Sequence, residues 1–121
     1  MRKWEIVEGN LASPQGFRAA AAAAGIKKLP GALDMALIFS DSPQTTAAGL
    51  FTTNLAAAAP VVVSRQHLAE SRGTCRAVVV NSGNANACTG SAGMRTAKET
   101  ARAAANLLEL ETRQVLVAST G

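Results

Sequence analysis

The chain ends in Ser119-Thr120-Gly121, which places a hydroxyl group and a backbone N–H side by side after the apolar run Val115–Ala118. A chain that leaves a strand at Thr120-Gly121 exposes both groups, and two donors aimed at one point make an oxyanion hole. A plain turn at the end of a strand has the same composition, so the Thr-Gly pair is weak on its own. Thr120 and Gly121 are therefore candidate residues for stabilising a developing negative charge.

A second polar stretch, NSGNANACTG at residues 81–90, follows three consecutive valines. Gly83 and Gly90 permit left-handed turns, and Asn84 and Asn86 tolerate the same conformations while hydrogen-bonding the backbone. One interpretation is an anion-binding nest at the start of a helix. The other, which we favour, is a strand-to-helix connection whose Asn side chains satisfy the turn. The spacing fits neither a phosphate-binding P-loop nor a dinucleotide fingerprint.

Nucleophilic and metal chemistry have few candidate residues in this chain. Cys88 lies near the expected start of a helix, where the pKa of a thiol can be lowered. No base stands near it in the sequence, so we expect Cys88 to be a small buried residue. His67 lies in the polar stretch SRQHLAESRG and is expected at the surface. Two cysteines and one histidine cannot supply a four-ligand zinc site.

Composition excludes several classes of protein. The 121 residues suit one domain or part of a larger one, and the net charge of +4 comes from scattered Lys and Arg. With 3% aromatic residues there is no stacking platform for bases, so we expect no nucleic-acid partner. We find neither a signal peptide nor an apolar run of membrane-spanning length, and we expect a cytoplasmic protein without membrane contact. The side chains of an alanine-rich core bury little apolar area per residue, which favours a chain that packs against another chain or another segment.

Apolar runs between turn signals predict several strands at short spacing. They cover residues 29–41, 45–54, 59–68, 74–83 and 114–120, with a turn at 71–74. The alanine-rich segment after Phe17 is as compatible with a helix as with a strand. Because no helix separates the first strands, we predict an antiparallel or mixed sheet.

One long helix is predicted between Ser91 and Glu111, with Ser91 as its N-cap. Its apolar positions recur at steps of three and four and form one stripe: Met94, Ala97, Ala101, Ala104, Ala105 and Leu108. Residues 76–119 thus follow the order strand, loop, helix, strand. The polar stretch at 81–90, the Asn/Gly loop, connects the expected strand to this helix. The helix is followed by the strand that ends in Thr120-Gly121.

With these motifs in this order, the chain resembles the ornithine acetyltransferases, the glutamate N-acetyltransferases of the ArgJ type. The resemblance rests first on NSGNANACTG, followed by the amphipathic helix and by VLVASTG at 115–121. It is supported by PQGFRAA at 14–20, AAGIKK at 23–28, LFTTN at 50–54 and AAPVVVSRQHL at 58–68. It covers nearly the whole chain from Gly9 onward.

The resemblance implies an enzyme of arginine biosynthesis that cuts itself into two subunits. The newly exposed N-terminal Thr of the second subunit takes the acetyl group from N-acetylornithine and passes it to glutamate, through an acetyl-threonine intermediate. In this chain the oxyanion hole of the family maps onto the Thr120 side chain and the Gly121 N–H. No cofactor is implied, although some members also accept acetyl-CoA as acetyl donor.

The fold implied by the resemblance is α/β, the layered α/β/β/α arrangement shared with self-processing aminopeptidases, which makes the alanine-rich segment a strand. Residues 1–121 correspond to the N-terminal portion of the larger subunit, with a mixed sheet and one long helix. The nucleophile is expected beyond Gly121, so this portion should be inactive alone. Its implied partners are the small-molecule substrates and the rest of its own chain, in a hetero-tetramer of two larger and two smaller subunits.

Two alternatives stay open on the sequence. The first is a relative of the same fold with another acyl substrate, such as a different acetyltransferase or an aminopeptidase, because this portion lacks the residues that set specificity. The second is a small anion-binding module that is complete at 121 residues.

Overall fold

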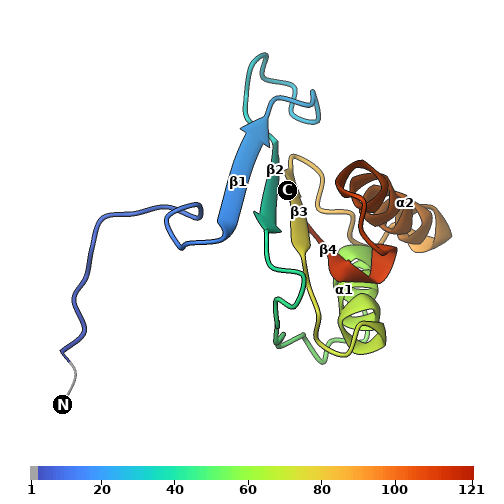
Figure 1. Cartoon of the computed structure of the whole chain (residues 1–121). Coiled ribbons are helices and arrows are strands. Elements are labelled where there is room, and N and C mark those ends of the chain that lie inside the picture. The colour runs from blue at the N-terminus through green and yellow to red at the C-terminus, as the bar shows by residue number, and fades with distance from the viewer. Residues whose placement is uncertain (1–2) are drawn as a thin grey trace.

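The computed structural model describes residues 3–121 as a four-stranded sheet with two α-helices (Figure 1). The elements in chain order are β1 (Phe17–Ala22), β2 (Met35–Ser40), α1 (Ala59–Glu70), β3 (Ala77–Ser82), α2 (Gly90–Leu108), a 3-10 turn (Thr112–Gln114) and β4 (Val115–Thr120). The strands lie side by side in the order β1-β2-β3-β4. The pairs β1–β2 and β2–β3 are antiparallel, and β3–β4 is parallel, so the predicted mixed sheet is confirmed.

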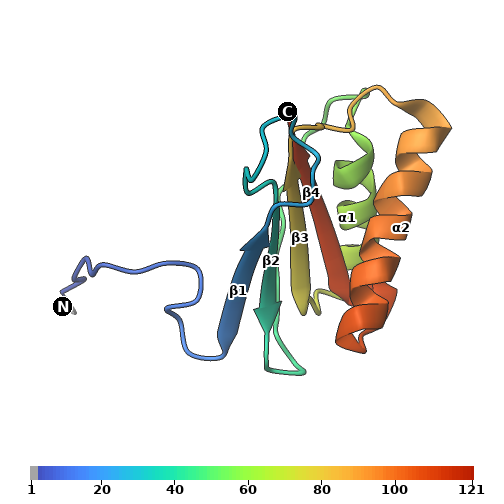
Figure 2. The same cartoon turned by 90° about the horizontal axis from the view of Figure 1, so that it is seen from above.

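The helices lie on one side of the sheet (Figure 2). The apolar stripe of α2 faces the strands, and Ala97, Ala101 and Ala105 are buried as predicted. Small residues there let the helix approach the sheet closely. Within residues 3–121, the largest fully buried side chains are those of Val63 and Val115. The core therefore buries little apolar area per residue, as the composition indicated.

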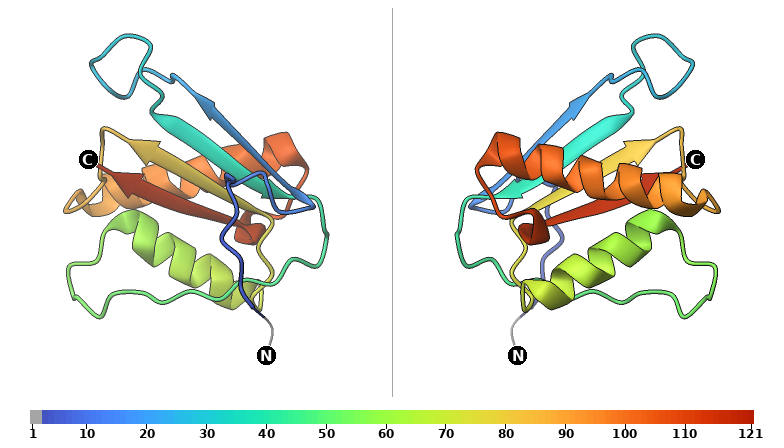
Figure 3. Two further views of the ribbon diagram at one scale, coloured as in Figure 1. Left: turned by 90° about the vertical axis from the view of Figure 1, so that its left-hand side faces the viewer. Right: turned by 90° about the vertical axis from the view of Figure 1, so that its right-hand side faces the viewer.

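The other face of the sheet has no helical layer in residues 3–121. Figure 3 shows this face in its left panel and the helical face in its right panel. Because side chains alternate along a strand, the residues that neighbour the buried ones point to this uncovered face. They are apolar and remain half-buried or exposed: Ala36, Ile38, Val78, Val80, Leu116 and Ala118. A face of this composition is typical of a sheet that packs against a further layer.

The alanine-rich segment forms β1, as the resemblance implied and against the helix propensity of alanine. Every residue of β1 pairs with a residue of β2, from Phe17 opposite Ser40 to Ala22 opposite Met35. All six residues of β1 are exposed. Pairing with a neighbouring strand has therefore decided its structure, because intrinsic propensity is weaker than tertiary context.

Two sequence expectations are wrong at the level of elements. Residues 59–68, expected as a strand, belong to α1, so the structure contains two helices where one long helix was expected. Pro60 lies in the first turn of α1, where its missing N–H costs nothing. Residues 45–54, expected to be strand-like, are irregular apart from one bridge between Thr46 and Thr74.

Candidate functional site

The ends of β3 and β4 lie together, because the two strands are parallel and Ser82 pairs with Thr120. Strand alternation puts the Thr120 side chain on the uncovered face, on the same side as Leu116 and Ala118. Thr120 and Gly121 are exposed, and within residues 3–121 no hydrogen bond uses the Thr120 hydroxyl. A Cβ built on Gly121 would meet only the Ala85 Cβ, at 3.9 Å. The sequence placed this pair at the end of a strand, and the structure agrees.

The Asn/Gly loop is held by its own amide side chains. Asn81 Nδ2 donates to the Asn84 carbonyl oxygen at 2.9 Å, and Asn84 Oδ1 accepts the Asn86 N–H at 3.0 Å. Asn86, which is buried, donates through Nδ2 to the Gly93 carbonyl at 2.9 Å and accepts from the Thr89 hydroxyl at 2.5 Å. These bonds run from β3 to the first turns of α2. They are what the connection interpretation predicted for the loop.

The N-cap expectation for α2 is wrong. The helix begins at Gly90, its N-cap is Thr89, and Ser91 already lies inside the helix. The Thr89 hydroxyl makes no capping bond to the helix backbone, because it donates to Asn86 instead.

A side-chain hydrogen bond joins the end of β3 to β4. The Ser119 hydroxyl donates to Asn81 Oδ1 at 2.5 Å, and the two residues are partners in the parallel ladder. This contact lies one residue before Thr120. This contact was not predicted, although the two motifs place an Asn and a Ser at the ends of expected strands.

Asp34 anchors the connection between β1 and β2 at the same end of the sheet. Its carboxylate accepts the N–H groups of Ala24, Ile26 and Lys27 at 2.7, 2.6 and 2.9 Å. The bonds from Lys27 and then Ala24 hold the pKa of this buried carboxyl below its ordinary value of 3.8, against the opposing effect of burial. Asp34 was not predicted as a site residue, and its one signal in the sequence is a carboxylate at the start of an apolar strand.

The anchored segment packs closely on the Asn/Gly loop. Gly83 has a φ of +98°, and a Cβ there would meet Lys27 Cγ at 2.8 Å and Ile26 Cγ2 at 3.3 Å. Only glycine combines this backbone conformation with this approach. The Ser82 N–H also donates to the Asp34 carbonyl at 2.9 Å. Two loops that are distant in sequence are thereby fixed to one another beside the ends of β3 and β4.

Helix α1 runs along the free edge of β4, as both panels of Figure 3 show. The Ser64 hydroxyl donates to the Val117 carbonyl at 2.7 Å and accepts the Val117 N–H at 2.9 Å. His67 Nδ1 lies 2.8 Å from the Val115 carbonyl oxygen. These side chains satisfy backbone groups that an edge strand would otherwise leave unpaired.

His67 is therefore buried, and the expectation of a surface residue is wrong. It contacts the first residue of β4, which at the rise of an extended strand lies about 17 Å from Thr120. His67 has a structural role at the sheet edge, and this position rules it out as a base for Thr120.

The expectation for Cys88 is also wrong, because this thiol is exposed. Its φ of +55° turns the chain just before α2 and keeps the side chain out of the core. The buried cysteine is Cys75, and loss of solvation raises the pKa of its thiol. Within residues 3–121 no three His, Cys, Asp or Glu side chains are grouped as metal ligands. None of the described helices is both long and apolar enough to cross a bilayer.

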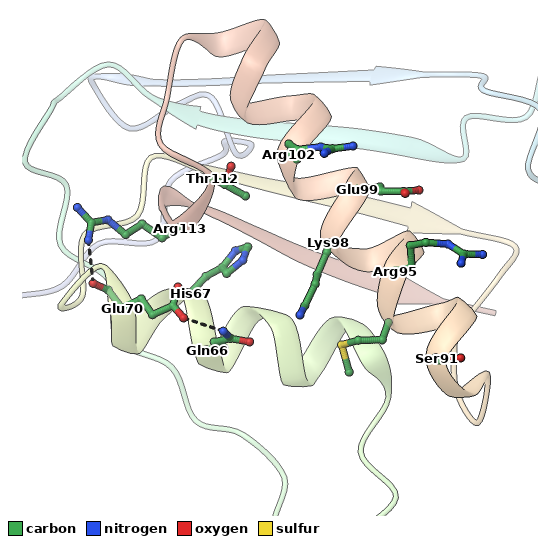
Figure 4. A pocket seen from close by; sticks show the side chains of 11 residues that line it. Gln66, His67, Glu70, Ser91, Arg95, Lys98, Glu99, Arg102, Thr112 and Arg113 are labelled. Atoms are coloured by element: carbon green, nitrogen blue, oxygen red, sulfur yellow. Dashed lines mark hydrogen bonds between the residues drawn. The ribbon is translucent and has the colours of Figure 1, made fainter.

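A groove between α1 and α2 lies on the outer side of the helical layer (Figure 4). Lys98 points from α2 toward α1, and Glu70 accepts a hydrogen bond from Gln66 at 2.7 Å. Thr120 and Gly121 do not line this groove. It is a charged surface between two helices, separate from the strand ends.

Comparison with known proteins agrees with this architecture. The model of the ArgJ family matches residues 18–121. The arginine biosynthesis bifunctional protein ArgJ of Gloeobacter violaceus is 50% identical over 121 residues, which are 100% of this chain and 29% of that protein. The ArgJ protein of Geobacter sulfurreducens is 53% identical over 107 residues, 88% of this chain and 26% of that protein. The chain thus spans less than a third of the length of these curated relatives.

Solved structures give the same result. The crystal structure of ornithine acetyltransferase from Mycobacterium tuberculosis, complexed with ornithine, aligns with a TM-score of 0.85 at 49% identity, over 92% of this chain and 58% of that one. The ArgJ protein of Bacillus halodurans aligns with a TM-score of 0.84 at 34% identity, over 93% of this chain and 57% of that one. From the family model, the relatives and the shared fold, we conclude that this chain belongs to the ArgJ family.

Proposed function

We propose that these residues are the N-terminal part of the larger subunit of a glutamate N-acetyltransferase, which moves an acetyl group from N-acetylornithine to glutamate in arginine biosynthesis. The observation that supports this most is the end of β4. In a chain of the ArgJ family, an exposed Thr120 with an unbonded hydroxyl stands next to an exposed Gly121 at the mouth of two parallel strands. We assign the oxyanion hole to the Thr120 hydroxyl and the Gly121 N–H.

The chemistry asked of these two groups is simple. A threonine hydroxyl of the second subunit attacks the acetyl carbonyl of N-acetylornithine, and the carbonyl oxygen becomes an oxyanion. Donors that are fixed in place before the reaction stabilise this charge without reorganisation, and this is the role we propose for the Thr120 hydroxyl and the Gly121 N–H. The C–N bond then breaks, the amine leaves with a proton as ornithine, and the acetyl group stays on threonine as an ester. The amine of glutamate attacks this ester in the second half of the cycle.

The remaining parts of the proposal concern the whole protein. Its partners are the two amino-acid substrates and the rest of its own chain, including the self-cleaved second subunit, in a cytoplasmic hetero-tetramer of two larger and two smaller subunits. Acetyl-CoA is a possible second acetyl donor. The proposed nucleophile is the N-terminal threonine of the second subunit, so we expect no acetyl transfer from residues 1–121 alone.

The assignment of Thr120 is tested in the complete enzyme with Thr120→Ala. Loss of one oxyanion donor lowers kcat by roughly 10²- to 10³-fold, while KM for N-acetylornithine changes little. The measurement is steady-state acetyl transfer from N-acetylornithine to glutamate. Thr120→Ser keeps the hydroxyl and is the matched control, with kcat close to that of the unmodified enzyme.

Intact mass of each purified variant gives the fraction cut into two polypeptides, the second of which should begin with Thr. kcat is then expressed per cut molecule, which separates chemistry from maturation. An unchanged kcat in Thr120→Ala contradicts the oxyanion assignment. A cut enzyme that transfers acetyl groups only between other substrates, or hydrolyses peptides, favours a relative with another acyl substrate.

A further inference from the structure

Asn81 and Ser119 lie directly behind the candidate oxyanion hole. Their side chains point to the helical face, as do Val79 and Val117, whereas Thr120 points to the uncovered face. We propose that Asn81 is a positioning residue of the acetyl-transfer site: through Ser119 it fixes the end of β4, and thereby the two donors of Thr120 and Gly121. This inference rests on the proposed function and adds a residue to it.

The end of β4 needs such support because β4 is the edge strand of the sheet that residues 3–121 form. Helix α1 holds the first half of the strand, through His67 at Val115 and Ser64 at Val117. Within residues 3–121, no side chain of α1 bonds β4 beyond Val117. From Ser119 onward, the strand is held by its ladder with β3 and by the Ser119–Asn81 bond. Thr120 and Gly121, which follow Ser119, carry the two proposed oxyanion donors, so their positions matter for the proposed catalysis.

The amide of Asn81 has the two functions that this place requires. Its oxygen accepts from Ser119, and its nitrogen donates to the Asn84 carbonyl in the loop. Asn84 is in turn bonded to Asn86, and Asn86 to Gly93 of α2. Asn81 thus ties the end of β4 to the backbone of the loop, whereas the side-chain bonds of Asn86 belong to the start of α2 and do not reach β4.

Hydrogen bonds, more than packing, must orient Asn81. A hollow of about 220 Å³ opens beside it on the helical side, and Ser119, Thr96 and Thr100 also line this space. A side chain next to open space has other rotamers available when its bonds are removed. Displacement of a catalytic donor by about 1 Å can cost on the order of 10²-fold in rate. Loss of the Ser119–Asn81 hydrogen bond should therefore lower kcat, although neither residue touches substrate.

The test uses Ser119→Ala and Asn81→Ala in the complete enzyme. Each variant is expected to lower kcat about 10- to 100-fold per cut molecule, with KM for N-acetylornithine unchanged. The double variant should be no slower than the slower single variant, because both remove the same tie. Ser119→Thr keeps the hydroxyl and should restore most of kcat.

Asn86→Ala is the matched control for stability. Asn86 belongs to the same run of amides and is buried, but it bonds to α2 and not to β4. Its replacement should lower the melting temperature while leaving kcat near normal. If Ser119→Ala and Asn81→Ala behave like Asn86→Ala, with a lower melting temperature and a normal kcat, the positioning role of Asn81 is overturned.

Thr120→Ala measured in parallel separates this inference from the proposed function. A slow Thr120→Ala beside normal Asn81 and Ser119 variants keeps the oxyanion hole and refutes the positioning role. Normal kcat in all three refutes both. Slow Ser119→Ala and Asn81→Ala, with rescue by Ser119→Thr, supports the inference.

Discussion

Asp34 fixes the loop between β1 and β2, which lies beside the ends of β3 and β4. It is buried, and its two oxygens take three backbone N–H groups from a segment of four residues, Ala24–Lys27. A carboxylate that accepts several backbone bonds is favoured in its charged form, which is why its pKa is lowered. The segment it holds is the one that packs against Gly83. A single charge thus determines how two loops meet beside the strand ends.

A pH-dependent loss of stability follows for Asp34→Asn in the complete protein. Because the folded-state pKa lies below 3.8, the charged form stabilises the fold at pH values above 3.8, and this contribution is lost as the pH falls through the folded value. Asp34→Asn should therefore unfold at a lower urea concentration than the unmodified protein at pH 7. The difference in midpoint should shrink below pH 4.

Asp41→Asn is the control for this comparison, because Asp41 makes an exposed ion pair with Arg18. Exposed pairs contribute little, so its midpoint should stay close to that of the unmodified protein. A midpoint difference for Asp34→Asn that is the same at pH 3 and pH 7 would contradict the charge-based account.

Much of the candidate site could be predicted from the sequence, because it lies in local motifs. Thr120 and Gly121 follow a β-branched run, and the Asn/Gly loop follows another, so both were placed at strand ends. The Asp34 bonds reach only 7 to 10 positions along the chain, but they were missed because they depend on the fold of an irregular loop that no periodic pattern marks. The Ser119–Asn81 bond was missed because it joins residues 38 positions apart. A single sequence gives no register between strands, and only the register brings these side chains together.

Helix α1 is an element that the sequence did not predict, again because contacts with distant residues decide its structure. Its three consecutive valines favour a strand by propensity, which is why a strand was predicted for residues 59–68. Yet its buried residues Pro60, Val63, Ser64 and His67 recur at helical spacing, and the free edge of β4 supplies partners for two of them. Tertiary contact decided the element. The strands at β2, β3 and β4 and the helix α2 were predicted because pattern, propensity and packing agree there.

Ser64→Ala tests the role of α1 in holding β4. The change leaves the N–H and C=O of Val117 without a partner in a buried position, which costs about 1–3 kcal/mol of unfolding free energy. Gln66→Ala lies on the exposed side of the same helix and should change stability by less than about 0.5 kcal/mol. Both are measured by urea unfolding of the complete protein. Equal midpoints for the two variants would show that Ser64 does not anchor the strand.

At the scale of the whole molecule, the sheet has one covered and one uncovered face within residues 3–121. One face packs on α1 and α2, and the opposite face presents an apolar surface that includes Ile38, Val78 and Leu116. A contiguous surface of this kind normally marks an interface. The implied α/β/β/α arrangement would place a second sheet on it. Thr120 points to this same face, so the oxyanion donors would open into the seam between the two sheets, where a second subunit can deliver a nucleophile.

Thiol labelling of the complete protein tests whether this face is covered. In a Cys88→Ser background, which removes the exposed native thiol, Val78→Cys should react with a maleimide only on unfolding, because a second layer shields it. Lys98→Cys, on the outer side of α2, should react within minutes under native conditions. Peptide mass spectrometry identifies the labelled site in each case. If Val78→Cys is labelled as fast as Lys98→Cys in native enzyme, no layer packs on this face, and Thr120 opens into solvent instead of into a seam.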